Sequence, residues 1–482
     1  MTSTIPCDCV ILLFVVLVCA TTVGCRPTDN RPLVVVLSGD TAGWIAPCGC
    51  ASNQSGGLPR RAMYVEGLRR QSEVILADVG GAVRGASPYD RAKFEAILRG
   101  ESLMGVVAHN LGAAEALLGA DELRRLIGEL GAPLLSANVR DSAGQLVAEP
   151  MRIVEAAGRR VALIGVLAER YATAELQVTP PRQAVLDVLR GGTGKYDALI
   201  VLAYLQEDEL RQLADALPEA DVVVGGPTGQ PVSPKLVGPT LLISATNKGK
   251  FLARLDAPAF RSAARWTGSI VELNEQFADD SRQTANIGRF RQQLADADFT
   301  PSQTSFAEPL PKELPRGFAV AGTAACRKCH EEECRLGRES KHAGAWKSLV
   351  EKGAHVDPDC QRCHTTGYGL PGGFASARQS GKLVAVGCES CHGPSQGHVA
   401  KPTIHTAYFA QAKNHCIRCH DHENSPKFEY EKYWKQIDHG ETPATEQLST
   451  GWHVPKRSER RDLRPTTPFA AQGVPPKLTN LF

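Results

Sequence analysis

The sequence predicts two folded domains, an α/β layered domain followed by a domain rich in cysteine and histidine. A chain of 482 residues is too long for a single hydrophobic core. Strand and helix patterns alternate from residue 31 to about residue 258, whereas strand periodicity is lost after residue 318. The cysteines mark the same division, since six of the 15 precede residue 51 and the other nine lie between residues 326 and 419. We therefore expect two different chemistries in the two regions.

The α/β domain is predicted from short apolar runs that alternate with helical patterns. Each run is β-branched or apolar and ends in Gly, Asp or Ser, which is typical of buried strands. The expected strands are 33–37, 74–77, 161–166, 198–202, 221–224 and 241–244. Helical patterns lie between them at 91–99, 121–130 and 206–216. This alternation predicts an α/β layered sandwich over residues 31–258.

The segments outside the two domains predict an export signal, a linker and a tail. Residues 10–20 form an apolar run that is too short to span a bilayer and suits an export signal. The small residue before Cys25 resembles a bacterial lipobox, so residues 1–25 predict an exported protein, periplasmic or anchored through a lipid on Cys25. Residues 259–317 predict a helix at 280–297 followed by a proline-rich linker, and residues 441–482 predict a disordered tail.

One short motif occurs four times between residues 318 and 440. Every C-x-x-C pair there is followed directly by histidine: Cys326, Cys329 and His330; Cys360, Cys363 and His364; Cys388, Cys391 and His392; Cys416, Cys419 and His420. Two thiols at this spacing add to the two vinyl groups of one porphyrin, and the next histidine coordinates the iron, which is the c-type haem signature. Zinc or disulfides are the alternative, but four histidines would then have to follow four pairs by coincidence. The motifs predict four covalently bound haem c groups.

The axial ligands on the far side of each haem are expected to be histidines. The four methionines lie at or before residue 151, outside the haem region, so histidine–methionine ligation is not expected. Eight further histidines lie in or after this region: His342, His355, His398, His405, His415, His422, His439 and His453. These are enough for several bis-histidine, low-spin haems of rather low potential.

Residues 321–440 resemble the tetrahaem cytochrome c-554 family. The matching stretches are 340–346 (SKHAGAW), 363–368 (CHTTGY), 387–394 (GCESCHGP) and 419–426 (CHDHENSP). The resemblance implies a mostly helical, haem-packed fold in which His342, His398, His439 and His405 are distal ligands. In that family one haem can lack a protein sixth ligand, and His355 and His415 are candidates to fill such a place here.

Residues 33–258 resemble the calcineurin-like metallophosphatase superfamily, in its 5'-nucleotidase branch. The similarity includes residues 56–62, 133–139, 159–165 and 221–226. Such enzymes use two metal ions held by Asp, Asn and His at strand ends. Here the family's ligand positions read Asp40-Thr-Ala42, Asp78-Val-Gly-Gly81, Ala113-Ala114, Tyr204 and Pro227-Thr-Gly229. Because Asp40 and Asp78 alone cannot hold two ions, we expect a metallophosphatase-like scaffold that lacks phosphatase chemistry.

Three further cysteines have no assigned role. Cys48 and Cys50 would form a strained disulfide, stay as thiols, or make a metal or redox contact near the haems. Cys334 has no clear partner in the sequence.

The sequence favours an electron-transfer protein over a catalyst, with no catalytic residue assigned. We expect redox proteins as electron donor and acceptor, with the α/β domain serving docking. The net charge of +2 gives no argument for a nucleic-acid partner. Two other functions stay open: a multihaem oxidoreductase acting on a small nitrogen compound at a five-coordinate haem, and a phosphoesterase tethered to a cytochrome.

Overall fold

The computed structural model describes residues 31–47, 54–192, 194–259, 262–307, 309–310, 312–379, 381–421 and 424–439, without the side chains of 410–413. The predictions for the export signal, Cys25, Cys48, Cys50, His422, His453 and the tail lie outside these residues. Among the helices that are described, none has both the length and the apolar character needed to cross a membrane.

The first sheet has six strands in the order β14-β13-β1-β2-β3-β4. Strands β1 (Leu33–Ser38), β2 (Glu73–Asp78), β3 (Val106–Asn110) and β4 (Leu134–Leu135) are parallel. Strands β13 (Phe251–Asp256) and β14 (Thr267–Glu272) add an antiparallel edge. Helices α1 (Leu58–Arg69) and α2 (Pro88–Met104) are the crossover connections between parallel strands, as this topology requires.

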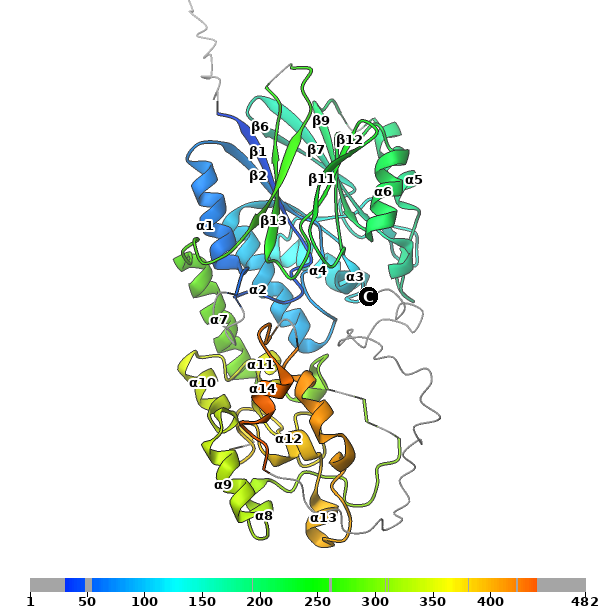
Figure 1. Ribbon diagram of the computed structural model, residues 1–482. Coiled ribbons are helices and arrows are strands. Elements are labelled where there is room, and N and C mark those ends of the chain that lie inside the picture. Colours follow the sequence, from blue (N-terminus) through cyan, green and yellow to red (C-terminus); the bar gives the residue numbers. More distant parts are fainter. Residues whose placement is uncertain are drawn as a thin grey trace, which may run out of the picture.

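The second sheet also has six strands, in the order β11-β12-β10-β9-β7-β6. Strands β7 (Arg159–Leu167), β9 (Ala198–Tyr204), β10 (Val222–Gly226) and β12 (Thr240–Ser244) are parallel. Strands β6 (Met151–Ala156) and β11 (Val232–Val237) are antiparallel edges. Helices α5 (Pro181–Arg190) and α6 (Glu207–Ala216) lie beside this sheet, away from the first one (Figure 1). Smaller elements are α3 (Ala113–Ala116), α4 (Ala120–Leu130), η1 (Glu169–Tyr171) and the pair β5 (Val139–Arg140) and β8 (Gln177–Val178).

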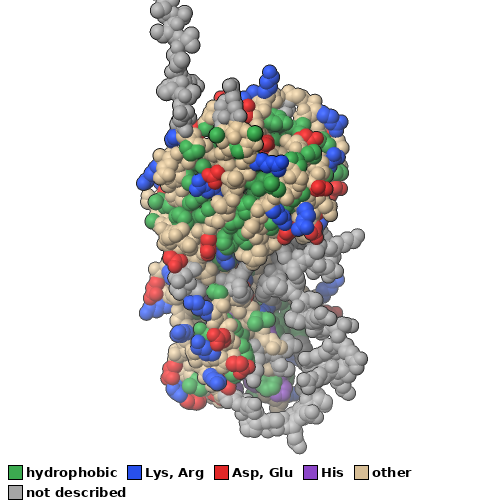
Figure 2. Space-filling view, turned by 45° about the horizontal axis from the view of Figure 1, so that its top comes forward, with side chains coloured by type: hydrophobic (Ala, Val, Ile, Leu, Met, Phe, Trp, Pro, Cys, Tyr) green, Lys and Arg blue, Asp and Glu red, His purple; other side chains and the backbone are tan. Residues whose placement is uncertain are grey.

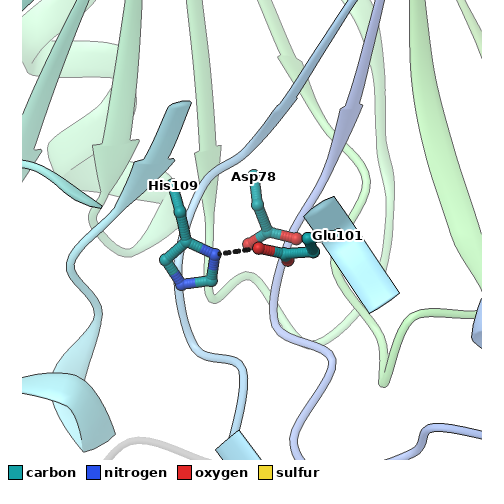
Figure 3. Close-up of side chains that lie close together, drawn as sticks. All are labelled: Asp78, Glu101 and His109. Carbon is teal, nitrogen blue, oxygen red and sulfur yellow. Dashed lines mark hydrogen bonds and ion pairs between the residues drawn. The ribbon is translucent and has the colours of Figure 1, made fainter. Parts of the chain in front are cut away.

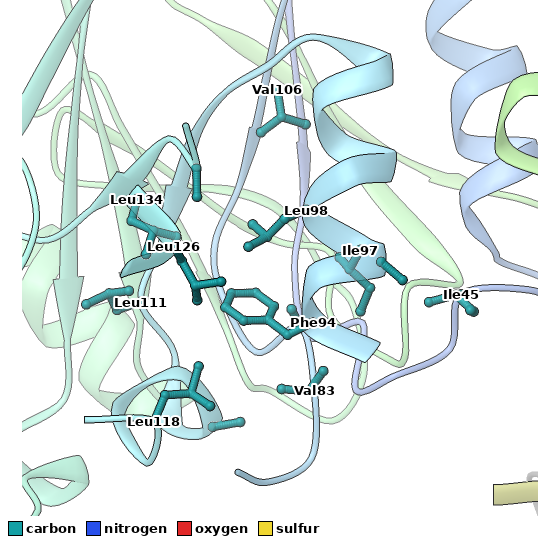
Figure 4. Close-up of a cluster of buried hydrophobic side chains, with 14 of the residues drawn as sticks. Ile45, Val83, Phe94, Ile97, Leu98, Val106, Leu111, Leu118, Leu126 and Leu134 are labelled. Atoms are coloured by element: carbon teal, nitrogen blue, oxygen red, sulfur yellow. The ribbon is translucent and has the colours of Figure 1, made fainter. Parts of the chain in front are cut away.

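The two sheets pack face to face, and alternating side chains of each strand fill different layers. In β1, Val35 and Leu37 belong to a buried cluster shared with Leu163 and Ile200 of the second sheet. Val34 and Val36, which alternate with them, point to the other face of the sheet. On that face, Figure 4 shows Phe94, Ile97 and Leu98 of α2 packed with Leu126 and Leu134. This alternation follows from the two-residue period of a strand. The predicted α/β layered sandwich is confirmed, with hydrocarbon layers between the sheets and beneath the helices.

The sheet continues past residue 258, where the sequence placed the end of the α/β domain. Strand β14 pairs with β13, and α7 (Ser281–Ala297) packs against α2 and α1. The helix expected at 280–297 is therefore present, but the segment before it is a sheet edge rather than part of a linker. Its sequence, TGSIVE, alternates between exposed and half-buried positions and has no continuous apolar run.

Residues 318–439 form short helices and turns below the α/β domain (Figure 1). The α-helices are α8 (Thr323–Cys326), α9 (Glu331–Glu339), α10 (Ala345–Glu351), α11 (Pro358–His364), α12 (Cys388–His392), α13 (Gln396–Ala400) and α14 (Tyr430–Trp434). The 3-10 helices are η3 (Lys341–Gly344) and η4 (Phe409–Arg418), while η2 (Pro301–Gln303) precedes the region. In the described part of 318–439 the strand-like pairing is a single bridge between Thr365 and Val384. Acidic and basic side chains are interspersed over both domains in Figure 2.

Candidate haem centres

Each C-x-x-C-H motif is held in about one turn of helix. Helix α11 ends at His364, and α12 begins at Cys388 and ends at His392. In the first motif the carbonyl of Cys326 accepts the backbone N–H of His330 at 3.0 Å, and in the fourth Cys416 accepts that of His420 at 2.8 Å. Residues three and four apart share one side of a helical turn. The turn therefore presents the two sulfurs and the imidazole of each motif to the same space.

In three of the motifs the histidine faces a second histidine, and the space between the two rings is about large enough for one metal ion. The ring centroids are 6.2 Å apart for His330 and His398, 6.0 Å for His420 and His342, and 5.8 Å for His392 and His439. Metal–imidazole bonds are about 2 Å long, so two imidazoles on opposite sides of one ion have ring centroids about 6 Å apart. The three pairs fit axial ligation of iron.

The second ring nitrogens of several histidines are fixed by hydrogen bonds. His398 Nδ1 lies 2.6 Å from the carbonyl oxygen of Ile404, and His439 Nδ1 lies 3.0 Å from that of Ile437. His420 Nδ1 is 2.9 Å from Ser425 Oγ, and His364 Nδ1 is 2.8 Å from the carbonyl oxygen of Ala345. A hydrogen bond at Nδ1 orients the ring and leaves Nε2 as the ligand. These hydrogen bonds would hold the imidazole rings in a fixed orientation toward a bound iron.

Burial favours the neutral form of three of the facing imidazoles and of His364. It lowers the pKa of His342, His392, His420 and His364 below the ordinary histidine value. Only a neutral imidazole has a lone pair to give to a metal.

His405, His355 and His415 lie beside aromatic rings. His405 stacks on Phe409 with ring centroids 4.4 Å apart, and His415 stacks on Tyr408 at the same distance. His355 lies 5.9 Å from the Trp346 ring. Among the described ring pairs, the structure brings His342, His398 and His439 to motif histidines but not His405.

The four motifs meet in two pairs that the sequence order does not reveal. The Cys326 side chain is within hydrogen-bonding reach of Cys388, which joins the first motif to the third. Cys363 is within the same reach of Cys419, which joins the second motif to the fourth. Cys334, for which the sequence offered no partner, is buried and reaches Cys388. Residues that would hold different haems are therefore in contact.

The edge of the first sheet, where the metallophosphatase ligands would lie, is occupied by buried side chains of this chain. The guanidinium of Arg61 donates to Ser38 Oγ and Thr41 Oγ1 at 2.9 Å each and lies 3.5 Å from Asp78 Oδ2. The Tyr204 ring packs against Gly81, so closely that a Cβ on that glycine would lie 2.7 Å from the ring. A cation and an aromatic ring thus fill part of the space at this edge.

A buried ion network lies behind this edge (Figure 3). Ligand atoms of Asp78, Glu101 and His109 lie within 4.8 Å of one another. His109 Nδ1 is 2.8 Å from Glu101 Oε2, and its Nε2 is 3.4 Å from Glu115 Oε1. Burial alone lowers the pKa of His109, but the adjacent Glu101 carboxylate and the hydrogen bonds that Glu101 and Glu115 accept raise it well above the ordinary value. Both ring nitrogens of His109 are thus engaged by carboxylate oxygens, so the group forms a buried network of ionisable side chains.

Asp40, the remaining acidic residue of the lost motif, differs from an ordinary surface carboxylate. Burial raises the pKa of Asp40 to about 6, although Lys248 opposes the rise. Its φ is 48°, in the left-handed region that non-glycine residues seldom adopt. Arg61, Glu101 and His109 could not be predicted from the sequence, because charged residues within ordinary strand and helix patterns carry no motif.

Known proteins are similar to parts of this chain in both domains. Residues 325–393 match the family model described as cytochrome c554 and c-prime. Cytochrome c-554 of Nitrosomonas europaea is 33% identical over 90 residues, which are 16% of this chain and 38% of that protein. The chain thus covers well under half of the length of this relative.

Solved structures with similar folds include a 5'-nucleotidase precursor from Thermus thermophilus, 20% identical, which aligns over 55% of this chain and 59% of its own with a TM-score of 0.46. A calcineurin-like phosphoesterase, YfkN from Bacillus subtilis, is 17% identical over 55% of this chain and 98% of its own, with a TM-score of 0.47. The family match lies within the region that carries the haem motifs, and the predicted resemblance of that region to the cytochrome c-554 family is confirmed.

Proposed function

We propose that this chain is an exported tetrahaem c-type cytochrome that transfers electrons between redox proteins. The observation that carries the proposal is the set of three imidazole pairs, each joining a C-x-x-C-H histidine to a distant one at 5.8–6.2 Å. Bound haem would supply a one-electron couple at each motif. The chain's own residues would attach it through the motif cysteines and ligate it through the paired histidines.

The pairing of motifs supports transfer from one centre to the next. Because Cys326 reaches Cys388 and Cys363 reaches Cys419, the attachment points of different haems touch in this fold. The third motif also lies beside the fourth, because α12, which ends at His392, packs against η4, which contains Cys416. These three contacts connect all four motifs in one series, with the first and second motifs at its ends.

The proposal is tested by counting haems on the purified full-length protein. We expect four haems per chain by pyridine haemochrome absorbance, and an intact mass that contains all four after denaturation. A Cys388→Ser, Cys391→Ser double variant should carry three. A wild-type chain without covalently attached haem would refute the function.

For the α/β domain we propose docking rather than phosphate-ester hydrolysis. The support is the buried Arg61 guanidinium beside Asp78, which puts a positive charge where an enzyme of that fold would hold divalent ions. The purified protein should release no phosphate from nucleotides with Mn²⁺ or Zn²⁺. Hydrolysis that follows metal addition would contradict this part of the proposal.

A further inference from the structure

The α/β domain contacts the second haem motif through a cluster of charged side chains. Arg84 lies in the loop after β2, and Tyr89 and Lys93 lie in the first turns of α2. On the other side, Asp357 and Asp359 begin α11, the helix that carries Cys360, Cys363 and His364. We call Arg84, Lys93, Asp357, Asp359 and Arg362 the interface cluster.

Ion pairs within the interface cluster join the two domains. Arg84 Nη1 is 3.2 Å from Asp359 Oδ1, and Lys93 Nζ is 3.8 Å from a carboxylate oxygen of both Asp357 and Asp359. Arg362, which lies between the two cysteines of the motif, reaches Asp359 at 3.0 Å. Three cations thus surround two carboxylates, which leaves one net positive charge (3 − 2 = 1) beside the motif.

The cluster is shielded from water, which strengthens its electrostatic effect. The Lys93 side chain is 5% exposed, and its ammonium lies 4.7 Å from the centre of the Tyr89 ring. The other charged side chains of the cluster are 15–21% exposed. Although burial raises the pKa of Asp359, the cations Arg84, Arg362 and Lys93 hold it well below its ordinary value. Asp359 is therefore ionised at neutral pH, in surroundings where charges interact strongly.

The cluster also fixes the start of helix α11. Asp357 Oδ1 accepts the backbone N–H of Asp359 at 3.0 Å, which caps the helix, and accepts the Tyr89 hydroxyl at 2.6 Å. The guanidinium groups of Arg84 and Arg362 both lie over the Phe306 ring, at 6.0 and 5.4 Å from its centre. The Asp357 carboxylate thus links α11, which carries the second motif, to Tyr89 of the α/β domain.

We propose that Arg84 and Lys93 are positioning residues for the haem attached at Cys360 and Cys363: they fix α11 and raise that haem's midpoint potential. The inference rests on the proposed haem attachment. Net charge near a haem is one of the protein's means of setting its potential. Reduction adds a negative charge, so nearby buried cations favour the reduced state and nearby carboxylates oppose it. The α/β domain then contributes directly to the redox chemistry of the other domain.

The test is a spectroelectrochemical titration of the full-length, haem-loaded protein. Arg84→Gln removes a cation and should lower one of the four potentials, whereas Asp359→Asn removes a carboxylate and should raise the same one. We expect the ratio of reduced to oxidised haem at a fixed potential to change about three- to tenfold, where tenfold corresponds to 59 mV for one electron. A His364→Met variant identifies which of the four spectra belongs to this haem.

Two controls separate charge from general damage. Arg84→Lys keeps the charge and should keep the potential. Arg91→Gln removes an arginine that pairs with Glu122 instead and lies in α2, the helix that carries Lys93. Shifts of Arg84→Gln and Asp359→Asn in the same direction, or no shift in either, would overturn the inference. So would an Arg84→Lys variant that behaves like Arg84→Gln.

Haem counts on the same samples separate this inference from the proposed function. Four haems without the opposite shifts would refute the inference alone. A wild-type chain without haem at Cys360 and Cys363 would refute both.

Discussion

The two domains of this chain are held together by different kinds of core. The α/β domain buries three clusters of hydrophobic side chains between and around its sheets. In the described part of residues 318–439 the buried hydrophobic residues are Val320, Cys334, Leu349, Ala354 and Phe374. The helices there have between four and ten residues. Isolated helices shorter than about 12–15 residues are marginal in water, so we expect the proposed haems to supply the core of this domain, whereas the α/β domain has a hydrocarbon core of its own.

The largest effect that would test this difference is removal of the haems. Replacing the eight motif cysteines with serine should unfold residues 318–440 while the α/β domain keeps a cooperative transition. Limited proteolysis followed by mass spectrometry would show cleavage confined to the C-terminal region. A haem-free protein that retains a cooperative melt for residues 321–440 would contradict the prediction.

The opposite test disturbs the core of the α/β domain and leaves the haem motifs intact. Phe94 of α2 is fully buried, so Phe94→Ala should cost about 3–5 kcal/mol of unfolding free energy. Urea unfolding followed by the fluorescence of Trp44 and Trp266 measures this loss. The haem absorbance spectrum before the transition should match that of the wild type. A spectrum altered in native buffer would show that the two cores are not independent.

Substituting distal histidines should change one haem at a time. His398→Ala removes the ring that faces His330, so one of the low-spin haem signals should be lost from the electron paramagnetic resonance spectrum. His405→Ala is the matched control, because His405 stacks on Phe409 and should leave the spectrum unchanged. Equal spectra for the two variants would contradict the ligand pairs assigned from the structure.

The smallest predicted effect is the pH dependence that His109 gives the α/β domain. Its folded-state pKa is raised above the unfolded value of about 6.5, so its contribution is complete below that pH and is lost as pH rises toward the folded pKa. Unfolding free energy should therefore fall between pH 7 and pH 9, by at most about 1.4 kcal/mol per pH unit. In the Glu101→Gln, His109→Gln double variant this slope should disappear, as measured by urea titration at each pH. A slope that persists would assign it to other groups.

The strands that the sequence predicted are those with continuous apolar runs. Strands β1, β9 and β10 lie inside the sandwich and read as such runs. Strands β13 and β14 were not predicted, because charged or small polar residues interrupt the apolar residues of FLARLD and TGSIVE, and β14, at the sheet edge, has no fully buried position. Strand β3 ends in His109 and Asn110, which are buried polar residues that hide its apolar character.

In the candidate site, the sequence revealed the residues whose spacing is set by covalent haem attachment. It did not reveal which residues come into contact only in the folded chain. The C-x-x-C-H residues follow from the chemistry of attachment, and His342, His398 and His439 followed from family resemblance. The interface cluster was missed because Arg84 and Asp359 are 275 positions apart, and isolated charges carry no signal of a partner. The motif pairs Cys326 with Cys388 and Cys363 with Cys419 were missed for the same reason.

The hydrogen bond from His364 to the Ala345 carbonyl has a mechanical consequence. Ala345 begins α10, and η3 directly before it contains His342, which faces His420. Only two residues separate the Ala345 carbonyl, which orients His364, from His342. A rotation of either imidazole therefore strains a backbone segment shared by both, so that insertion of one residue in this turn should disturb the second and fourth centres together.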